Sequence, residues 1–320
     1  MRPFNAPRSA HHCFPSLLFL FSLSLSFSFS TAATAASDGY TRTHYPIVLI
    51  HGMALFDDML GVSGWYSIPR QLRKGGAEVF VLQVSALNTT ELRGEQAARQ
   101  IETILATTGA EKVNLIGHSH GSPTARYVAG VYPQFVASVT SAHGVNWGTP
   151  VADAMQQNLQ QRNFSGRLFK LVMGAWGAMV NTLTGDPLPQ SYPLELEALS
   201  TAKALVFNAQ YPDGMPRQYC GDGAPVANGI YYFSWTGNRV MTNLADITDY
   251  GLLASAALMD EPNDGLVPVC ATYLGQVIRD NYRMNHIDAI DHLFGLHSSK
   301  DTDPPVVYRQ QANRLQQLGL

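Results

Sequence analysis

Short apolar runs alternate with longer amphipathic segments along most of this chain, beginning near residue 45. The short runs are rich in Val, Ile and Leu, which is typical of strands buried on both faces of a sheet. The longer segments repeat apolar residues every three or four positions, as helices that lie against a sheet do. The pattern predicts strands over 47–50, 79–84, 113–116 and 137–141, with helices over 65–74, 95–105 and 122–131 between them.

This alternation of strand and helix predicts the α/β class, with a mostly parallel central sheet and helices on both faces. The rhythm stops between residues 151 and 212, a stretch too long for a loop and periodic like a helix. We therefore expect a helical insertion over the carboxyl edge of the sheet. Late strands over 229–235 and 276–279 and a closing helix over 306–318 complete the pattern.

One segment of the insertion carries an apolar stripe at helical spacing. An ordinary helix packed on the core would show the same stripe. Its place above the carboxyl edge favours a movable lid, whose apolar face is exposed when an oil surface covers it. The stripe consists of Phe164, Leu168, Leu171, Val172, Ala175, Trp176, Met179 and Val180, and Arg162, Arg167 and Lys170 border its start.

The first 36 residues have the composition of a secretory signal peptide. Arg2 and Arg8 precede an apolar run over 17–29, and small residues at 32–36 suit cleavage. A retained membrane anchor is the alternative, but the run is short for a bilayer span. We therefore expect a secreted, extracellular protein whose residues 37–320 form one domain.

Net charge and cysteine content bear on the partners of the protein and on its disulfides. The net charge is −3, and removal of the two leader arginines leaves 19 basic against 24 acidic residues, a net charge of −5. This balance argues against nucleic acid as a partner. Cys13 lies in the leader, which leaves Cys220 and Cys270 as a pair. In an exported protein a disulfide is expected, although two buried thiols remain an alternative.

The run Gly117-His118-Ser119-His120-Gly121 follows a predicted strand and precedes a predicted helix. G-x-S-x-G in this setting places a serine hydroxyl on a sharp turn above the sheet, and a glycine-serine turn without chemistry is the simpler alternative. Ser119 is therefore the candidate nucleophile. Backbone N–H groups of His120 and of Met53, in the loop after the first strand, are the candidate oxyanion donors, and His51 is expected to pack beneath that loop.

A serine nucleophile needs a histidine base, and the base needs a carboxylate that orients it. Asp264, in a turn that is expected to feed a strand at 266–267, and His286, after the following strand, are well placed. The residues alone do not decide whether Asp264 is the acid and His286 the base, because a surface turn or a satisfied polar side chain would have the same sequence pattern. The other acids after turns are Asp246 and Asp288, and the other histidines are His120, His143, His292 and His297.

From about Tyr40 to Leu320 the chain resembles the secreted true lipases of Gram-negative bacteria, the Pseudomonas-type lipase family I of the α/β-hydrolase superfamily. The matching segments include 45–53, 113–121, 263–267 and 277–286, together with Thr242-Asn243. The resemblance implies an α/β-hydrolase fold with a helical lid insertion and the triad Ser119, Asp264 and His286.

The same resemblance pairs Cys220 with Cys270 and implies a structural Ca²⁺ site. Its ligands would be the carboxylates of Asp246 and Asp288 with the backbone carbonyls of His292 and Leu296. A hard cation needs several oxygens, and Asp288 lies two residues beyond His286, so the ion would hold the base in place. Without the family, a solvated acidic loop is the simpler interpretation.

The chain departs from that family at residues 143–149. These lipases usually have a Gly/Ala-Pro-His-x-Gly-Ser turn, whereas this chain has His143-Gly144-Val145-Asn146-Trp147-Gly148-Thr149. This difference is expected to affect the geometry of the loop and the substrate preference, while the triad positions are unchanged.

These expectations describe a monomeric triacylglycerol lipase that acts on lipid esters at an oil–water interface, with a lipase-specific foldase as a maturation partner implied by the resemblance. A short-chain carboxylesterase or polyester depolymerase on the same scaffold is the nearest alternative. A catalytically silent hydrolase used for binding would lack a triad member, and all three are present.

Overall fold

A computed structural model describes residues 38–55, 57–59, 62–160, 164–185, 187–298, 300 and 303–320. The predicted signal peptide lies outside the described residues, as does Arg162. Among the helices described, none is long and apolar enough to cross a bilayer.

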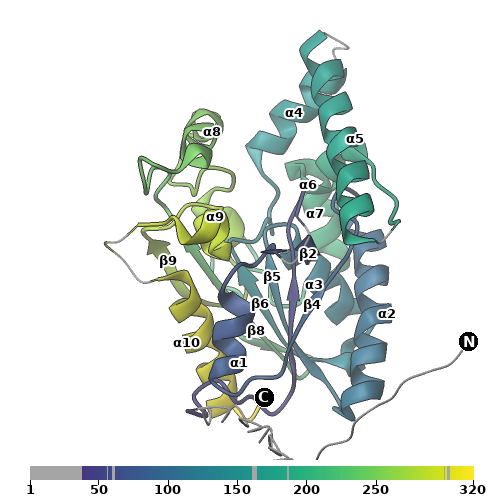
Figure 1. The fold of residues 1–320 in the computed structure, drawn as a ribbon, viewed down its shortest axis with the longest axis vertical. Helices are drawn as coiled ribbons and strands as arrows, with labels where there is room; N and C mark the ends of the chain where they lie inside the picture. The colour runs from purple at the N-terminus through teal and green to yellow at the C-terminus, as the bar shows by residue number, and fades with distance from the viewer. Residues whose placement is uncertain are drawn as a thin grey trace, which may run out of the picture. The chain divides into compact units, whose positions relative to one another are not determined.

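A largely parallel sheet forms the centre of the fold (Figure 1). Its strands run in the order β4, β1, β5, β6, β8 and β9, and the short β7 pairs antiparallel with β8. The mostly parallel sheet predicted from the alternation is thus confirmed. The bounds are Ile47–Ile50 for β1, Val79–Leu82 for β4, Val113–His118 for β5, Val136–Ala142 for β6, Val226–Ala227 for β7, Ile230–Gly237 for β8 and Gln276–Tyr282 for β9.

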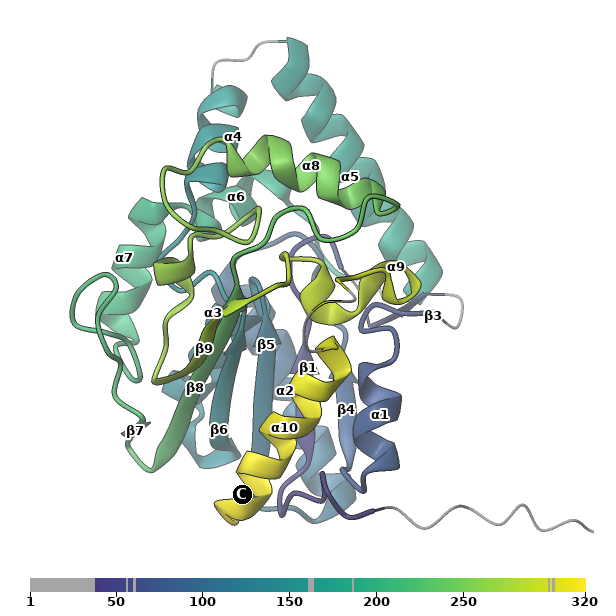
Figure 2. The same cartoon turned by 90° about the vertical axis from the view of Figure 1, so that its left-hand side faces the viewer.

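Helices cover both faces of this sheet, as Figures 1 and 2 show. Helices α2 (Thr90–Thr108) and α3 (Gly121–Val131) pack on one face, and α1 (Ile68–Lys74) and α10 (Pro304–Gln317) on the other. Strand β1 supplies both cores because successive side chains alternate: Val48 joins the first cluster and Leu49 the second.

Helix α2 is longer than the predicted 95–105. It begins after Thr89, whose side chain accepts a hydrogen bond from the Leu92 N–H at 3.2 Å. It ends at Gly109, which has the left-handed conformation typical of a helix end. Its first turn has only one apolar residue, Leu92, so the apolar stripe alone did not mark it.

The predicted insertion over 151–212 consists of helices at the carboxyl ends of the strands (Figure 1). Its third helix, α6, joins a core cluster with Val145 and Val267 from loops of the main fold. Of the lid stripe, Leu171 is exposed and Val180 is buried, while most of the other side chains lie outside those described. The helices are α4 (Pro150–Gln160), α5 (Phe164–Thr184), α6 (Tyr192–Leu199) and α7 (Thr201–Gln210).

Shorter elements complete the described part of the chain. They are β2 (Asp58–Met59), β3 (Val62–Ser63), α8 (Ile247–Ala256), α9 (His292–Gly295) and the 3-10 turns η1 (Pro133–Phe135), η2 (Val269–Thr272) and η3 (Asp288–Ile290).

The strand expected at 266–267 does not form. The Asp264 carboxylate accepts hydrogen bonds from the N–H groups of Leu266 at 3.0 Å and Val267 at 2.8 Å. A backbone bound to a side chain in this way has no donors left for a neighbouring strand. The segment is therefore a loop closed by a single bridge between Asn263 and Pro268.

The expected disulfide between Cys220 and Cys270 is present, with Cα atoms 4.7 Å apart. Cys270 lies in η2, directly after the Asp264 loop. Fifty residues separate the two cysteines. In the chain-entropy model, a loop of this length lowers the entropy of the unfolded chain and so stabilises the fold by about 4 kcal/mol. The bond thus ties the acid-bearing loop to the segment after α7.

Candidate active site

Ser119 sits on a sharp turn between β5 and α3. Its φ is 55°, in the left-handed region that residues other than glycine rarely adopt. Close packing explains the neighbouring glycines: a Cβ on Gly117 would lie 2.2 Å from the Gly121 oxygen, and one on Gly121 would lie 2.0 Å from the Ile50 oxygen. The turn therefore requires glycine at both positions, as expected for a strained elbow that carries a candidate nucleophile.

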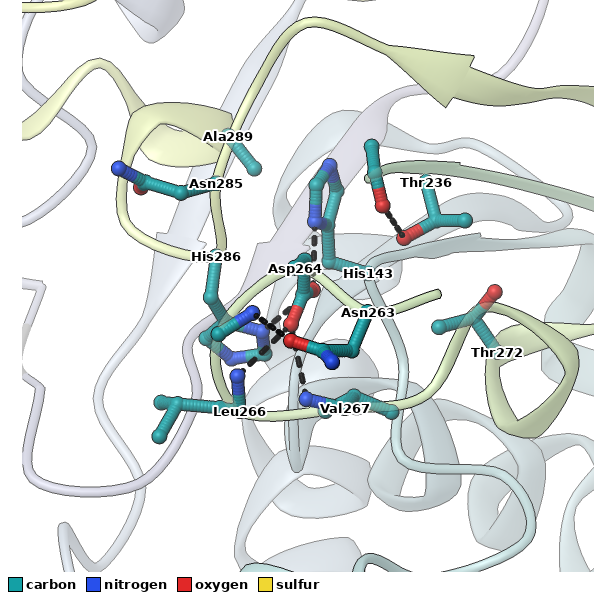
Figure 3. A network of polar contacts seen from close by, with 12 residues as sticks. His143, Thr236, Asn263, Asp264, Leu266, Val267, Thr272, Asn285, His286 and Ala289 are labelled. Carbon is teal, nitrogen blue, oxygen red and sulfur yellow. Dashed lines mark hydrogen bonds and ion pairs between the residues drawn. The ribbon is translucent and has the colours of Figure 1, made fainter. Parts of the chain in front are cut away.

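His286 is held by three hydrogen bonds, and the tertiary structure brings it beside Asp264 (Figure 3). Its Nδ1–H donates to Asp264 Oδ2 at 2.8 Å, and its backbone N–H donates to the Asp264 carbonyl at 2.9 Å. His118 Nε2–H donates to the His286 carbonyl at 2.9 Å. These bonds fix the ring and its tautomer, leaving Nε2 as the basic nitrogen.

Asp264 is fully buried and receives a second imidazole, that of His143, whose Nδ1 lies 2.8 Å from the same Oδ2. Burial by itself would raise the pKa of Asp264. The charge of His286 and the hydrogen bonds from both rings outweigh it and hold the pKa well below its usual range. The carboxylate therefore stays ionised at neutral pH.

Ser119 and His286 line one pocket, together with Met53. The pocket has a largely apolar wall, to which Val145, Leu266 and Val267 contribute from loops. Insertion helices α4 and α6 supply the rest of the apolar lining, namely Val151, Ala152, Met155, Leu196 and Leu199. The candidate nucleophile and the candidate base thus line the same apolar pocket.

The loop that carries Met53 rests on buried polar groups. His51 Nδ1–H donates to the Gly52 carbonyl at 2.9 Å, and its Nε2 accepts from the Val84 N–H at 3.3 Å. Burial lowers the pKa of His51 to about 3, so the ring is neutral. The buried Arg93 guanidinium donates to the His51 carbonyl. His51 therefore packs beneath the loop, as expected.

His120, which follows Ser119, is also tied down through its side chain. Its Nδ1 lies 2.6 Å from Glu195 Oε1, and its Nε2 lies 2.8 Å from Thr90 Oγ1. Glu195 comes from α6 and is completely buried, and its other oxygen accepts the Asn88 N–H at 2.8 Å. Burial lowers the pKa of His120, although Glu195 opposes the shift.

Asp246 and Asp288 meet in space, as the calcium expectation requires. Their carboxylates and that of Asp249 place an oxygen each within 4.8 Å of one another, and all three residues are buried. One Asp288 oxygen accepts the Asn285 N–H at 3.0 Å, while the other is buried without a partner. Burial raises the pKa of Asp288 to about 7.

The other two expected ligands lie nearby in sequence, at α9. His292 opens this short helix and lies close enough to Asp246 for that carboxylate to affect the pKa of its ring, which burial lowers. Leu296 directly follows the helix and is exposed. Asp249 was not among the expected ligands; its oxygens already accept the N–H groups of Thr242 and Asn243 and the amide of Asn285.

Two further residues of the site were not assigned by the sequence reasoning. His143 appeared only among several candidate bases, and it binds the acid instead. Glu195 lies in the insertion and carries no motif that would mark it. Its burial and its contact with His120 appear only when α6 packs beside the elbow.

Comparisons with known proteins show the family of this chain. A family model described as the alpha/beta hydrolase fold matches residues 45–171. A triacylglycerol lipase of Vibrio cholerae is 49% identical over 292 residues, covering 91% of this chain and 94% of that protein. One of Pseudomonas fragi is 38% identical, covering 88% and 100%.

Solved structures support the fold. The Staphylococcus hyicus lipase matches with a TM-score of 0.58 at 16% identity, covering 86% of this chain and 96% of that one. The mature Bacillus licheniformis lipase BlEst2 matches with a TM-score of 0.56 at 18% identity, covering 85% and 92%. At these identities the likeness concerns the fold alone.

Proposed function

This chain belongs to the bacterial triacylglycerol lipases of the α/β-hydrolase superfamily, and from that premise we propose that Ser119, His286 and Asp264 carry out its ester hydrolysis. The observation that carries the assignment is the strained elbow of Ser119, which opens into the same apolar pocket as a histidine already bound to a buried carboxylate. The substrate is the carboxylic ester of a lipid.

In the first half-reaction, His286 Nε2 takes the Ser119 proton as Oγ bonds to the ester carbonyl carbon. Asp264 stabilises the imidazolium without accepting its proton. The N–H groups of Met53 and His120 stabilise the oxyanion, each by about 3 kcal/mol. The imidazolium then protonates the leaving alcohol as the carbon–oxygen bond breaks, which leaves an acyl-enzyme.

The second half-reaction repeats these roles with water. His286 removes a proton from water while the hydroxide oxygen bonds to the acyl carbon. The proton then passes to Ser119 Oγ as the bond between Oγ and the acyl carbon breaks, and a fatty acid is released. The apolar lining from α4 and α6 suits an acyl chain, because its burial removes hydrocarbon surface from water.

Helix α5 is proposed to act as a lid. It belongs to the insertion at the carboxyl ends of the strands, and two of its large apolar side chains, Leu171 and Met179, are exposed. Helix α5 packs against α4 and α6, which line the pocket, and its exposed apolar surface suits contact with an oil surface.

The acidic cluster is proposed to hold a structural calcium ion. The chemistry of the residues fits, because a buried carboxylate oxygen of Asp288 has no partner and two further carboxylates lie beside it. Asp246 and Asp288 would supply charged oxygens, with carbonyls of His292 and Leu296. The ion would neutralise this negative charge and stabilise the loop between His286 and α9.

Export to the extracellular medium is proposed from the leader-like residues 1–36, and the disulfide supports an oxidising destination. Maturation by a lipase-specific foldase, which the family resemblance implies, and a monomeric state complete the proposal.

Replacing Ser119 with Ala tests the assignment directly. We expect at least a 10³-fold loss of kcat on a soluble ester with little change in melting temperature, because the nucleophile is lost and no packing is removed. A serine-directed phosphonate should label the wild type at Ser119 and leave the variant unlabelled. Label on another residue, or normal turnover, would disprove the mechanism.

The rival esterase or polyesterase shares this machinery and differs in its substrate. Rates on emulsified long-chain triglyceride, soluble short-chain ester and an aliphatic polyester film separate the three. A lipase gives its highest rate on the emulsion, with a jump in rate when substrate exceeds its solubility. Preference for the soluble ester, without that jump, would indicate the esterase.

A further inference from the structure

His143 is a buried histidine in a conformation that costs free energy. It directly follows β6, and its φ of 51° lies in the left-handed region. A residue other than glycine or asparagine is held there only where its surroundings require it. The contacts of its side chain should therefore show what holds it.

The His143 ring has one hydrogen-bonded nitrogen, and that nitrogen binds Asp264. Nδ1 lies 2.8 Å from Asp264 Oδ2, while Nε2 is buried without a partner. Because an ionised carboxylate only accepts, Nδ1 carries the proton and Nε2 is a bare acceptor. Burial lowers the pKa of His143, which keeps this neutral form; the titratable groups facing it are Asp264, His286 and His118.

With this bond, every acceptor site of the Asp264 carboxylate is used. Oδ1 accepts the backbone N–H groups of Leu266 and Val267, and Oδ2 accepts the imidazoles of His143 and His286. A carboxylate has about four lone-pair sites, so four donors fix its rotation completely. Figure 3 shows the two rings on different sides of the carboxylate.

We propose that His143 is a positioning residue of the catalytic machinery, which fixes Asp264 Oδ2 in the place from which it orients His286. The inference rests on the proposed role of Asp264 as the acid. Without His143, Oδ2 would lose one of its two donors, and the carboxylate could rotate about its remaining bonds. The base would then be oriented less well as it takes the Ser119 proton.

Two substitutions distinguish the effect of losing the hydrogen-bond donor from the effect of relieving the backbone strain. His143→Asn keeps a donor, because the asparagine Nδ2 lies near the place of the histidine Nδ1, and asparagine tolerates the left-handed region. His143→Gly also relieves the strain but has no donor. On a soluble ester, we expect kcat to fall about tenfold in the glycine variant and less than about threefold in the asparagine variant, with KM unchanged in both.

Titration with a phosphonate inhibitor gives the folded, active fraction, so that kcat is counted per working site. Equal losses in the two variants, or wild-type kcat in His143→Gly, would overturn the proposal. A change confined to KM would overturn it as well, because a positioning defect acts in the transition state.

A double-mutant cycle tests whether His143 acts through Asp264. In an Asp264→Asn background, His143→Gly should reduce kcat less than twofold, because the carboxylate that it positions is gone. A full tenfold loss in that background would show an independent role and refute the inference. If Asp264→Asn alone keeps wild-type activity, it is the acid assignment that fails.

Proton NMR gives a readout that does not depend on turnover. The His143 Nδ1–H, bonded to a buried carboxylate, should give a strongly deshielded, slowly exchanging signal in the wild type. His143→Asn should lose that signal and keep those of the His286–Asp264 and His120–Glu195 pairs. Protonation of His143 at Nε2 in place of Nδ1, seen with ¹⁵N-labelled histidine, would contradict the geometry.

Discussion

Glu195 Oε1 lies 2.6 Å from Nδ1 of His120, so a carboxylate from the helical insertion holds the residue that directly follows Ser119. Both side chains are completely buried, and the buried Arg93 guanidinium lies near the same carboxylate. The insertion therefore supports the elbow through His120 besides lining the pocket.

Loss of the Glu195 charge should reduce both stability and activity. Glu195→Ala leaves Arg93 without a nearby anion and leaves the His120 and Asn88 donors unpaired, which should cost about 3–5 kcal/mol. Glu195→Gln keeps an acceptor and should cost about 1.5–3 kcal/mol. Urea unfolding and kcat measure the two effects. Glu197→Gln, at an exposed position of the same helix, is the control and should change neither.

Gly52→Ala should inactivate the enzyme through steric displacement of the nucleophile. A Cβ at this position would lie 2.6 Å from the Ser119 Cβ and 3.2 Å from its Oγ. One of the two segments must move, and a shift of this size at the reacting atoms should lower kcat by about 10² or more. Gly251→Ala, where a Cβ meets nothing within 4 Å, should keep full activity and gain up to about 1 kcal/mol. Full activity in Gly52→Ala would contradict the packing.

Removal of calcium should lower stability and activity together. An ion present at 100 times its Kd stabilises the fold by about 2.7 kcal/mol, which a chelator would remove. The melting temperature and ester hydrolysis should both fall in chelator and recover on calcium addition. Asp288→Asn should melt at the same temperature with and without chelator, while the control Asp260→Asn, an exposed residue, should respond as the wild type. An unchanged wild-type melting temperature in chelator would exclude the site.

The lowered pKa of Asp264 predicts how its contribution to stability depends on pH. A carboxyl group whose folded pKa lies below its unfolded value of about 3.9 stabilises the fold above that value, and the stabilisation is lost as pH falls through the folded pKa. The difference in unfolding free energy between wild type and Asp264→Asn should therefore shrink as pH falls below about 4. A difference that grows as pH falls below about 4 would contradict the shift.

Several features of this protein follow from local sequence. The order of strands and helices could be predicted because buried strands and amphipathic helices each leave a periodic pattern. The elbow could be predicted because only glycine fits beside Ser119 in a turn this tight. The prediction of a strand at 266–267 was wrong because the Asp264 side chain accepts hydrogen bonds from the backbone N–H groups of this segment. The periodic pattern of apolar residues does not indicate such a contact.

What only the tertiary structure decided is which distant groups meet. The sequence left His143 and His286 as candidate bases, and folding placed both on Asp264, one of them lining the pocket beside Ser119. It also buried Glu195 against His120 and gathered Asp249 with Asp246 and Asp288. Contacts between residues that are tens or hundreds of positions apart depend on how whole elements pack. The local pattern of apolar and polar residues in one sequence does not determine that packing.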